Sequence, residues 1–196
     1  MVTEPAEVED AYLAIADYFD SEGYLEGIRL LNKLLETAMS ERATKENPAS
    51  VLFFVKALKR LTAAVVLIQK TGHKRNAAML VPPEDGYPDL SRVADFSRHQ
   101  CIPLWETFPR MLSEKEYFNP YIVFKKVSRF GDAGEWAYIL DEVFDYCFYE
   151  SSFAENSERY NVLTLQRLLQ KLIEACYLVV VRTRKDEGSE KQESVE

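Results

Sequence analysis

Two side chains, Arg92 and His99, have the chemistry and the spacing that could cleave an RNA chain. They are seven positions apart, which places both on one face if the segment between them is helical. The two cations could then bind a phosphate group, and the histidine could assist attack by the neighbouring 2′-hydroxyl. The pattern supports a small nuclease as an alternative function, with Arg92 and His99 as its candidate catalytic residues.

Small all-α nucleases of the HEPN class use an arginine followed roughly four to six residues later by a histidine on one helix. Six residues lie between Arg92 and His99, but the stretch from Val93 to Phe96 favours a helix only weakly. Asp95 also places a negative charge between the two cations. We therefore claim no resemblance to that family, and our leading interpretation has no catalytic residue.

A stripe of acidic and tyrosine side chains is the main candidate binding surface. Its members follow helical spacing on the side opposite Trp136 and Leu140: Glu135, Tyr138, Glu142, Asp145 and Tyr149. Such a stripe could bind a cationic peptide or a hydroxyl-rich ligand. The alternative, which we favour, is a solvated helix face or one paired with the cations of the preceding segment, Lys125, Lys126 and Arg129.

The chain lacks the common residue patterns of metal, nucleotide and nucleophile sites. Its two histidines, His73 and His99, belong to no HxxxH or ExxH pair, and no glycine-rich phosphate loop or GxSxG motif occurs. Cys101, close to His99, is the one candidate nucleophile, whereas Cys147 and Cys176 lie on apolar helix faces. We expect no metal site and no cofactor.

Composition restricts the partners and the compartment. With 24 Lys and Arg against 32 Asp and Glu, the net charge is −8, which disfavours nucleic acid as a partner because its backbone is also negative. Three cysteines without a CxxC pair are typical of a reducing compartment. The acidic start of the sequence shows no signal peptide, and the longest apolar stretch, 51–68, carries Lys56, Lys59 and Arg60. We expect a cytoplasmic protein without a membrane segment.

Helical periodicity extends over most of the chain. The spacing predicts helices over 8–19, 25–42 and 48–71. Gly23 is expected to end the first of them in a left-handed conformation. Asn47 and Pro48 are expected to begin the third as its N-cap and first helical residue, and Gly72 to end it.

A proline-rich segment divides the helical pattern. Residues 72–100 contain Pro82, Pro83 and Pro88, which predict an irregular connection. Further helices are expected at about 101–112, 113–118, 120–130, 133–151 and 157–181. A strand near 175–181 is a second possibility for that β-branched stretch, although nothing else in the chain offers it a partner.

Polar residues mark two helix starts and a terminal tail. Ser113 followed by Glu116 indicates a capping box, and Asp132 indicates an N-cap. Residues 182–196 are polar and charged, which predicts a disordered tail.

Residues 117–153 hold 12 of the 24 aromatic side chains. We expect most of them in the core, and those left on the surface to anchor a partner. The 12 residues are Tyr117, Phe118, Tyr121, Phe124, Phe130, Trp136, Tyr138, Phe144, Tyr146, Phe148, Tyr149 and Phe153.

The sequence therefore predicts an all-α protein, a single-domain bundle of about six to eight helices. The domain spans 1–181, with halves 7–71 and 101–181 joined by the irregular segment 72–100. The leading function is a non-catalytic protein-interaction or regulatory module that binds another protein or itself as a homodimer. Besides the nuclease, a helical small-ligand sensor is an alternative.

Overall fold

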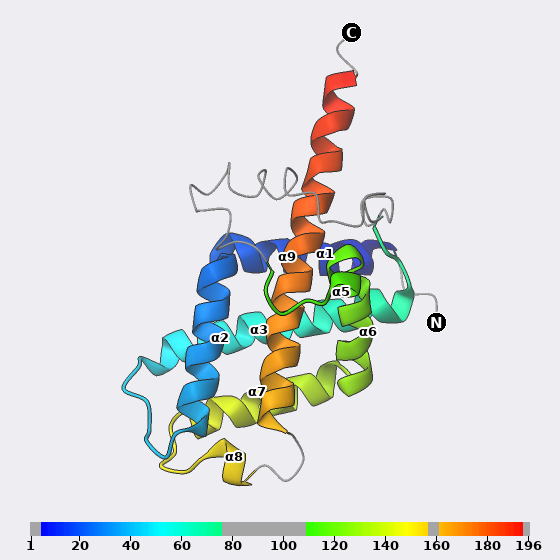
Figure 1. The fold of residues 1–196 in the computed structure, drawn as a ribbon. Helices are drawn as coiled ribbons and strands as arrows, with labels where there is room; N and C mark the ends of the chain where they lie inside the picture. Colours follow the sequence, from blue (N-terminus) through cyan, green and yellow to red (C-terminus); the bar gives the residue numbers. More distant parts are fainter. Residues whose placement is uncertain (1–4, 76–108, 157–160, 194–196) are drawn as a thin grey trace.

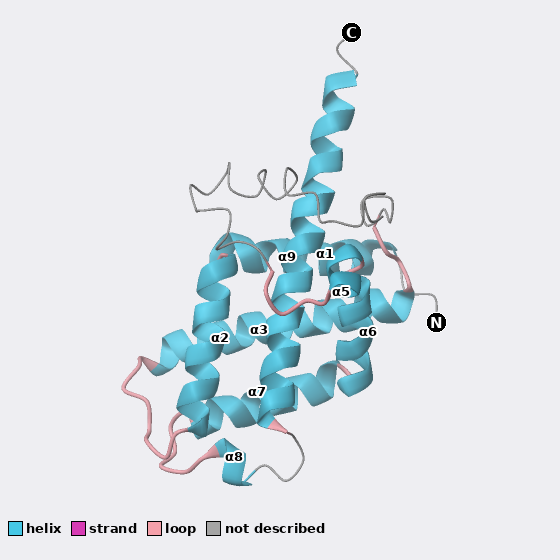
Figure 2. Cartoon of the chain, viewed as in Figure 1, coloured by secondary structure: helices cyan, strands magenta, loops and turns pink. Residues whose placement is uncertain are grey.

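The computed structural model describes residues 5–75, 109–156 and 161–193, with side chains described for 9–75, 109–154 and 161–183. These residues form helices and loops without a strand (Figure 2). The helices are α1 (Pro5–Ser21), α2 (Tyr24–Met39), α3 (Pro48–Thr71), α5 (Glu114–Phe118), α6 (Tyr121–Phe130), α7 (Ala133–Tyr146), α8 (Phe153–Asn156) and α9 (Val162–Glu193). The predicted all-α class is confirmed.

The longer helices form two crossed layers (Figure 1). In the nearer layer, α9 lies between α2 and α6 and contacts both. In the layer behind, α3 lies between α1 and α7 and contacts both. The layers meet where α3 packs on α6 and α2 packs on α7, and the C-terminal part of α9 projects beyond the bundle.

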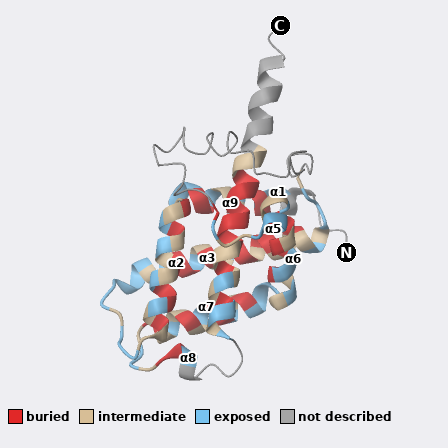
Figure 3. Cartoon of the chain, viewed as in Figure 1, coloured by how far each residue is buried: buried red, intermediate tan, exposed pale blue. Residues whose placement is uncertain are grey.

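Nearly all of the buried apolar side chains form one continuous cluster. It includes Ile15, Leu31 and Leu58 from the first three helices and Trp136 and Leu172 from the later ones. Figure 3 shows buried segments along both layers. Because residues from both ends of the chain fill the same core, α9 cannot leave without exposing α2 and α6.

Several predicted helix ends are confirmed by their hydrogen bonds. Asn47 accepts a bond from the N–H of Ala49 at the start of α3, with Pro48 as the first helical residue. Gly72 ends that helix at φ 73° and ψ 1°, the left-handed region that glycine enters without a Cβ penalty. Capping boxes begin α5, between Ser113 and Glu116, and α7 after its N-cap Asp132.

Other ends differ from the prediction. Gly23 follows α1 with the expected positive φ of 71°, and its N–H donates to the Phe19 carbonyl at 3.0 Å. Its ψ of 165° lies outside the left-handed helical region, however, and it also serves as the N-cap of α2. Helix α2 ends at Met39 rather than at residue 42, and α7 ends at Tyr146 rather than at 151. At the end of α7, Cys147 and Phe148 donate backbone bonds three residues back to Phe144 and Asp145, a tighter turn than the α-helix.

The last helix also differs from the prediction. Residues 175–181 are helical rather than a strand, and α9 continues to Glu193 through the stretch expected to be a disordered tail. A helix that already exists extends at little cost, because nucleation is the expensive step. Arg, Lys, Glu and Gln, which dominate this stretch, are good helix formers.

Some predictions concern residues outside the described part of the chain. These are the candidate pair Arg92 and His99, the thiol of Cys101, most of the irregular segment 72–100 and residues 101–108 of the helix expected over 101–112. The described residues of that expected helix, 109–112, form a loop instead, because the backbone N–H groups of 110–112 donate to the Glu174 carboxylate. The helix expected to start at Ser157 begins at Val162, after the non-helical residue 161. In the described residues, no helix has the length and apolar character required to cross a membrane.

Candidate functional site

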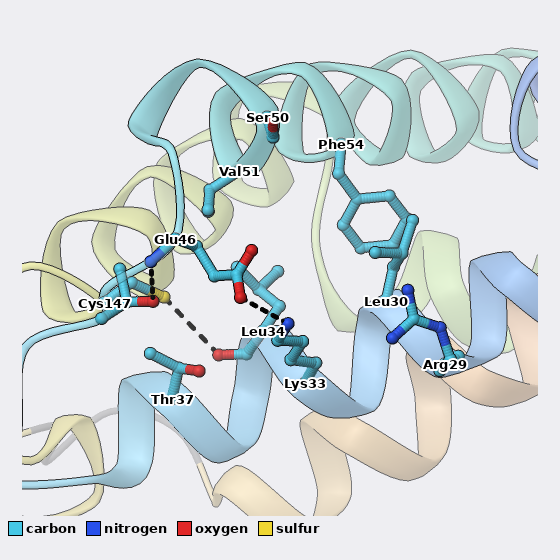
Figure 4. A pocket seen from close by; sticks show the side chains of 11 residues that line it. Arg29, Leu30, Lys33, Leu34, Thr37, Glu46, Ser50, Val51, Phe54 and Cys147 are labelled. Atoms are coloured by element: carbon cyan, nitrogen blue, oxygen red, sulfur yellow. Dashed lines mark hydrogen bonds and ion pairs between the residues drawn. The ribbon is translucent and has the colours of Figure 1, made fainter.

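A small apolar pocket opens between α2, the first turns of α3 and the end of α7 (Figure 4). Its volume is about 100 Å³. The apolar lining comes from Leu30 and Leu34 on α2 and from Val51 and Phe54 on α3. The connection 40–47, which joins α2 to α3, adds Thr44 and Glu46 to the lining.

Cys147 joins the pocket wall to the connection between α2 and α3. Its carbonyl oxygen accepts a 2.7 Å bond from the N–H of Thr44, and its thiol donates to the carbonyl of Leu34 at 3.5 Å and of Val143 at 3.3 Å. Burial raises the pKa of Cys147 to about 12. The thiol is therefore protonated at neutral pH and supplies a fixed wall rather than a nucleophile.

Charged side chains surround the mouth of the pocket. Lys33 donates to Glu46 at 2.6 Å, and this ion pair lowers the pKa of the Glu46 carboxyl. Arg29 pairs with Glu26 and also lines the pocket, as do the hydroxyl-bearing Thr37, Thr44 and Ser50. An apolar interior with a polar edge of both charges is an arrangement that binds a side chain or small molecule without reacting with it.

The stripe expected along 135–149 lies on the solvent side of α7. Tyr138 is 51% exposed and Tyr149, just beyond the helix end, is 57% exposed. Two of its carboxylates have local partners: Glu135 completes the capping box of α7, and Glu142 accepts a 3.0 Å bond from the Tyr138 hydroxyl. Asp145 is exposed.

The cations proposed to pair with this stripe do not do so. Among the described side chains, no ion pair joins its carboxylates to Lys125, Lys126 or Arg129, and Lys126 binds Glu116 instead. The solvated-face interpretation therefore describes the stripe better than the ion-paired one.

Few of the aromatic side chains of 117–153 reach the surface. Tyr121, Phe124, Trp136 and Phe153 are buried. Four others pack against the core: Phe130, Phe144, Tyr146 and Phe148. Tyr138 and Tyr149 are the large, strongly exposed members of this set among the described residues.

Two buried carboxylates were not singled out as sites by the sequence. Glu116 is fully buried and binds Lys126 at 2.7 Å and Lys171 at 2.6 Å, which joins α5 to α6 and α9. Burial alone would raise its pKa, but these two bonds and those from Ser113 outweigh it and lower the pKa to about 2. This cluster is a structural junction, since each oxygen of Glu116 is already bonded.

Glu174, on α9, binds the loop that precedes α5. Its two carboxylate oxygens accept bonds of 2.9–3.2 Å from the backbone N–H groups of Arg110, Met111 and Leu112. Burial raises the pKa of Glu174, while these backbone bonds oppose that effect. The partners lie 62 to 64 positions away in sequence, so a helical periodicity on α9 could not indicate them.

Two tyrosines hold the residues that follow α3. The hydroxyls of Tyr12 and Tyr121 are 2.9 Å apart, and Tyr12 also bonds the His73 carbonyl and the Arg75 N–H, each at 3.1 Å. Arg75 lies over the Tyr12 ring and pairs with Glu9 at 2.5 Å. The basic residues after α3 are thus bound to α1, in addition to lying at a helix C-terminus.

Within the described residues, no group of three or more His, Cys, Asp or Glu side chains is placed to hold a metal ion.

Comparison with known proteins returns no match. No protein-family model, no curated protein and no solved structure is similar to this chain.

Proposed function

We propose that this chain is a non-catalytic protein-interaction module whose pocket between α2 and α3 receives one apolar side chain of a partner protein. The observation that carries the proposal is the pocket of Figure 4, an apolar cavity open at the surface and edged by charges of both signs. Binding energy at protein interfaces concentrates where an anchor side chain enters such a cavity.

The size of the cavity favours a side chain as the occupant. An apolar cavity of roughly 150 Å³ can hold a benzene molecule, and this pocket has about 100 Å³. The space therefore suits a leucine, isoleucine or methionine side chain better than an aromatic ring. A free molecule this small would bury too few atoms to bind tightly, whereas a side chain adds the contacts of its own backbone and neighbours.

The reactive groups among the described residues of the pocket are already bonded, which supports a binding role. The Cys147 thiol donates to two carbonyls and is protonated, and Lys33 is engaged by Glu46. A partner segment with an apolar residue between polar ones would match both the interior and the edge.

Short peptides with one variable central residue between polar flanks test this proposal. Fluorescence anisotropy should show binding when the central residue is leucine, isoleucine or methionine. When it is alanine, the affinity should be at least about tenfold lower, because the buried apolar area is lost. Phenylalanine should bind more weakly than leucine.

A matched pair of substitutions locates the binding. Val51→Phe should fill the pocket and abolish binding, while Leu52→Phe, on the same turn of α3 but outside the lining, should leave it unchanged. Equal binding of the leucine- and alanine-centred peptides, or unchanged binding by Val51→Phe, would exclude this pocket as the interaction site.

A further inference from the structure

A second and larger cavity, on another face of α2, has the features of a ligand site. It has a volume of about 430 Å³ and lies between α2, α9 and the loop before α5. This volume falls within the range of small-molecule sites, roughly 300–1,000 Å³. Its apolar side is formed by Leu25, Ile28 and Met111.

Hydrogen-bond donors with unused capacity line this cavity. Tyr24 is 4% exposed, its ring stacks on Tyr177 at 4.5 Å, and its hydroxyl has no bonded partner among the described residues. The Arg110 side chain likewise makes no ion pair within the described part of the chain, although its charge acts on Tyr24. Because Tyr24 and Arg110 both line the cavity, a bound ligand can accept hydrogen bonds from the Tyr24 hydroxyl and the Arg110 guanidinium.

Helix α9 supplies a negative charge, the Glu174 carboxylate, opposite in sign to that of Arg110. Gln170 donates to Asn32 at 2.7 Å, which leaves the Gln170 carbonyl oxygen and the Asn32 amino group without a bond inside the described structure. Glu174 lies one turn further along α9, and its carboxylate is held in place by backbone N–H groups. The cavity thus combines an acceptor and a negative charge from α9 with donors and a positive charge from Tyr24 and Arg110.

We infer that this cavity binds a small zwitterion of the α-amino acid class with an apolar side chain. The carboxylate would bind Arg110 and the Tyr24 hydroxyl, and the ammonium group would bind the Gln170 carbonyl in the field of Glu174. The side chain would contact Leu25, Ile28 and Met111. A simple carboxylate would be repelled by Glu174, and a simple amine by Arg110, so a ligand carrying both charges is selected.

Titration calorimetry on the full chain tests the inference with L-leucine and L-methionine. The two single-charge analogues of leucine, 4-methylpentanoate and 3-methylbutylamine, are compared with them. We expect saturable binding of the amino acids, and binding at least about tenfold weaker for both analogues, since each loses one charged contact.

Two substitutions and two matched controls locate the ligand. Arg110→Ala should weaken leucine binding by about tenfold or more. Tyr24→Phe should weaken it severalfold, because it loses one hydrogen bond. Arg110→Ala keeps the backbone N–H that Glu174 needs. Arg129→Ala and Tyr149→Phe, at exposed positions elsewhere, should bind like the unchanged chain.

Three results would overturn the inference: no saturable binding of either amino acid at about 10 mM, equal binding of 4-methylpentanoate, or unaltered binding by Arg110→Ala. This site is separate from the pocket of Figure 4. Val51→Phe should therefore leave amino acid binding intact, and each proposal can fail without the other.

Discussion

Replacing Gly27 by alanine should destabilise the protein only while Tyr18 keeps its hydroxyl group. A Cβ atom at Gly27 would lie 2.7 Å from the Tyr18 hydroxyl oxygen, well inside van der Waals contact. Tyr18 is 3% exposed, so its ring cannot move into solvent to relieve the clash. The hydroxyl has no hydrogen-bond partner among the described residues, so removing it sacrifices no bond.

The magnitudes follow from three terms. Overpacking costs about 1–3 kcal/mol, and alanine regains about 1 kcal/mol of helix propensity over glycine, so Gly27→Ala should lower the free energy of unfolding by about 1 kcal/mol. Tyr18→Phe removes an unsatisfied buried hydroxyl and should change stability by about 0 to +1 kcal/mol. In the double variant the nearest ring carbons remain at 3.4 Å, an ordinary contact distance. That variant should exceed the parent by about 1–2 kcal/mol.

Urea unfolding followed by circular dichroism measures all four corners of this double-mutant cycle. The expected coupling free energy between positions 18 and 27 is about 1–3 kcal/mol. Tyr149→Phe, which removes an exposed hydroxyl, serves as the control and should not rescue Gly27→Ala. If Gly27→Ala costs the same with and without Tyr18→Phe, the steric explanation of this glycine is wrong.

Three further predictions concern acid stability, thiol reactivity and self-association. Because the pKa of Glu116 falls from 4.5 in the unfolded chain to about 2 in the folded one, its stabilisation is complete above pH 4.5 and is lost as pH falls through about 2. Glu116→Gln should therefore remove up to about 3 kcal/mol of this pH dependence in urea titrations, and an unchanged profile would contradict the assignment. Burial raises the pKa of Cys147 and Cys176, so a thiol reagent should modify at most one of the three cysteines of the folded chain. Modification of two or three cysteines before unfolding would show that the buried thiols become exposed to solvent in the folded state. If the chain forms a homodimer through the exposed tyrosines, sedimentation equilibrium should show Tyr138→Ala shifting it toward a 22.6 kDa monomer, while a monomeric parent chain would rule the dimer out.

The features that sequence reasoning predicted well depend on residues near one another in the chain. Asn47 caps α3 through an N–H two positions away, and Ser113 and Glu116 cap α5 across three positions. Such bonds require only local backbone geometry, which the residue types strongly favour. The same locality explains the correct all-α assignment, because the apolar spacing of each helix is independent of its neighbours.

The features that were missed depend on packing between distant segments. In the sequence, nothing near Gly27 indicates why a glycine is needed there, because the reason is its contact with Tyr18 of α1. The pocket of Figure 4 is lined by residues of α2, α3, the connection between them and the end of α7, and no single helix contains that information. Periodicity identifies which face of a helix is apolar, but it does not specify which other face lies opposite.

Glu174 shows why the candidate ligand site in particular could not be read from the sequence. On α9 it is one carboxylate among apolar residues, and the obvious partner for it would be a lysine or arginine. Its partners are instead three backbone N–H groups, which every residue except proline possesses and which therefore leave no mark in the residue types. The guanidinium group of Arg110 therefore does not bond Glu174, although the backbone N–H of Arg110 is one of the donors. This division, in which the backbone holds the carboxylate and the guanidinium remains available, is what allows both charges to line one cavity.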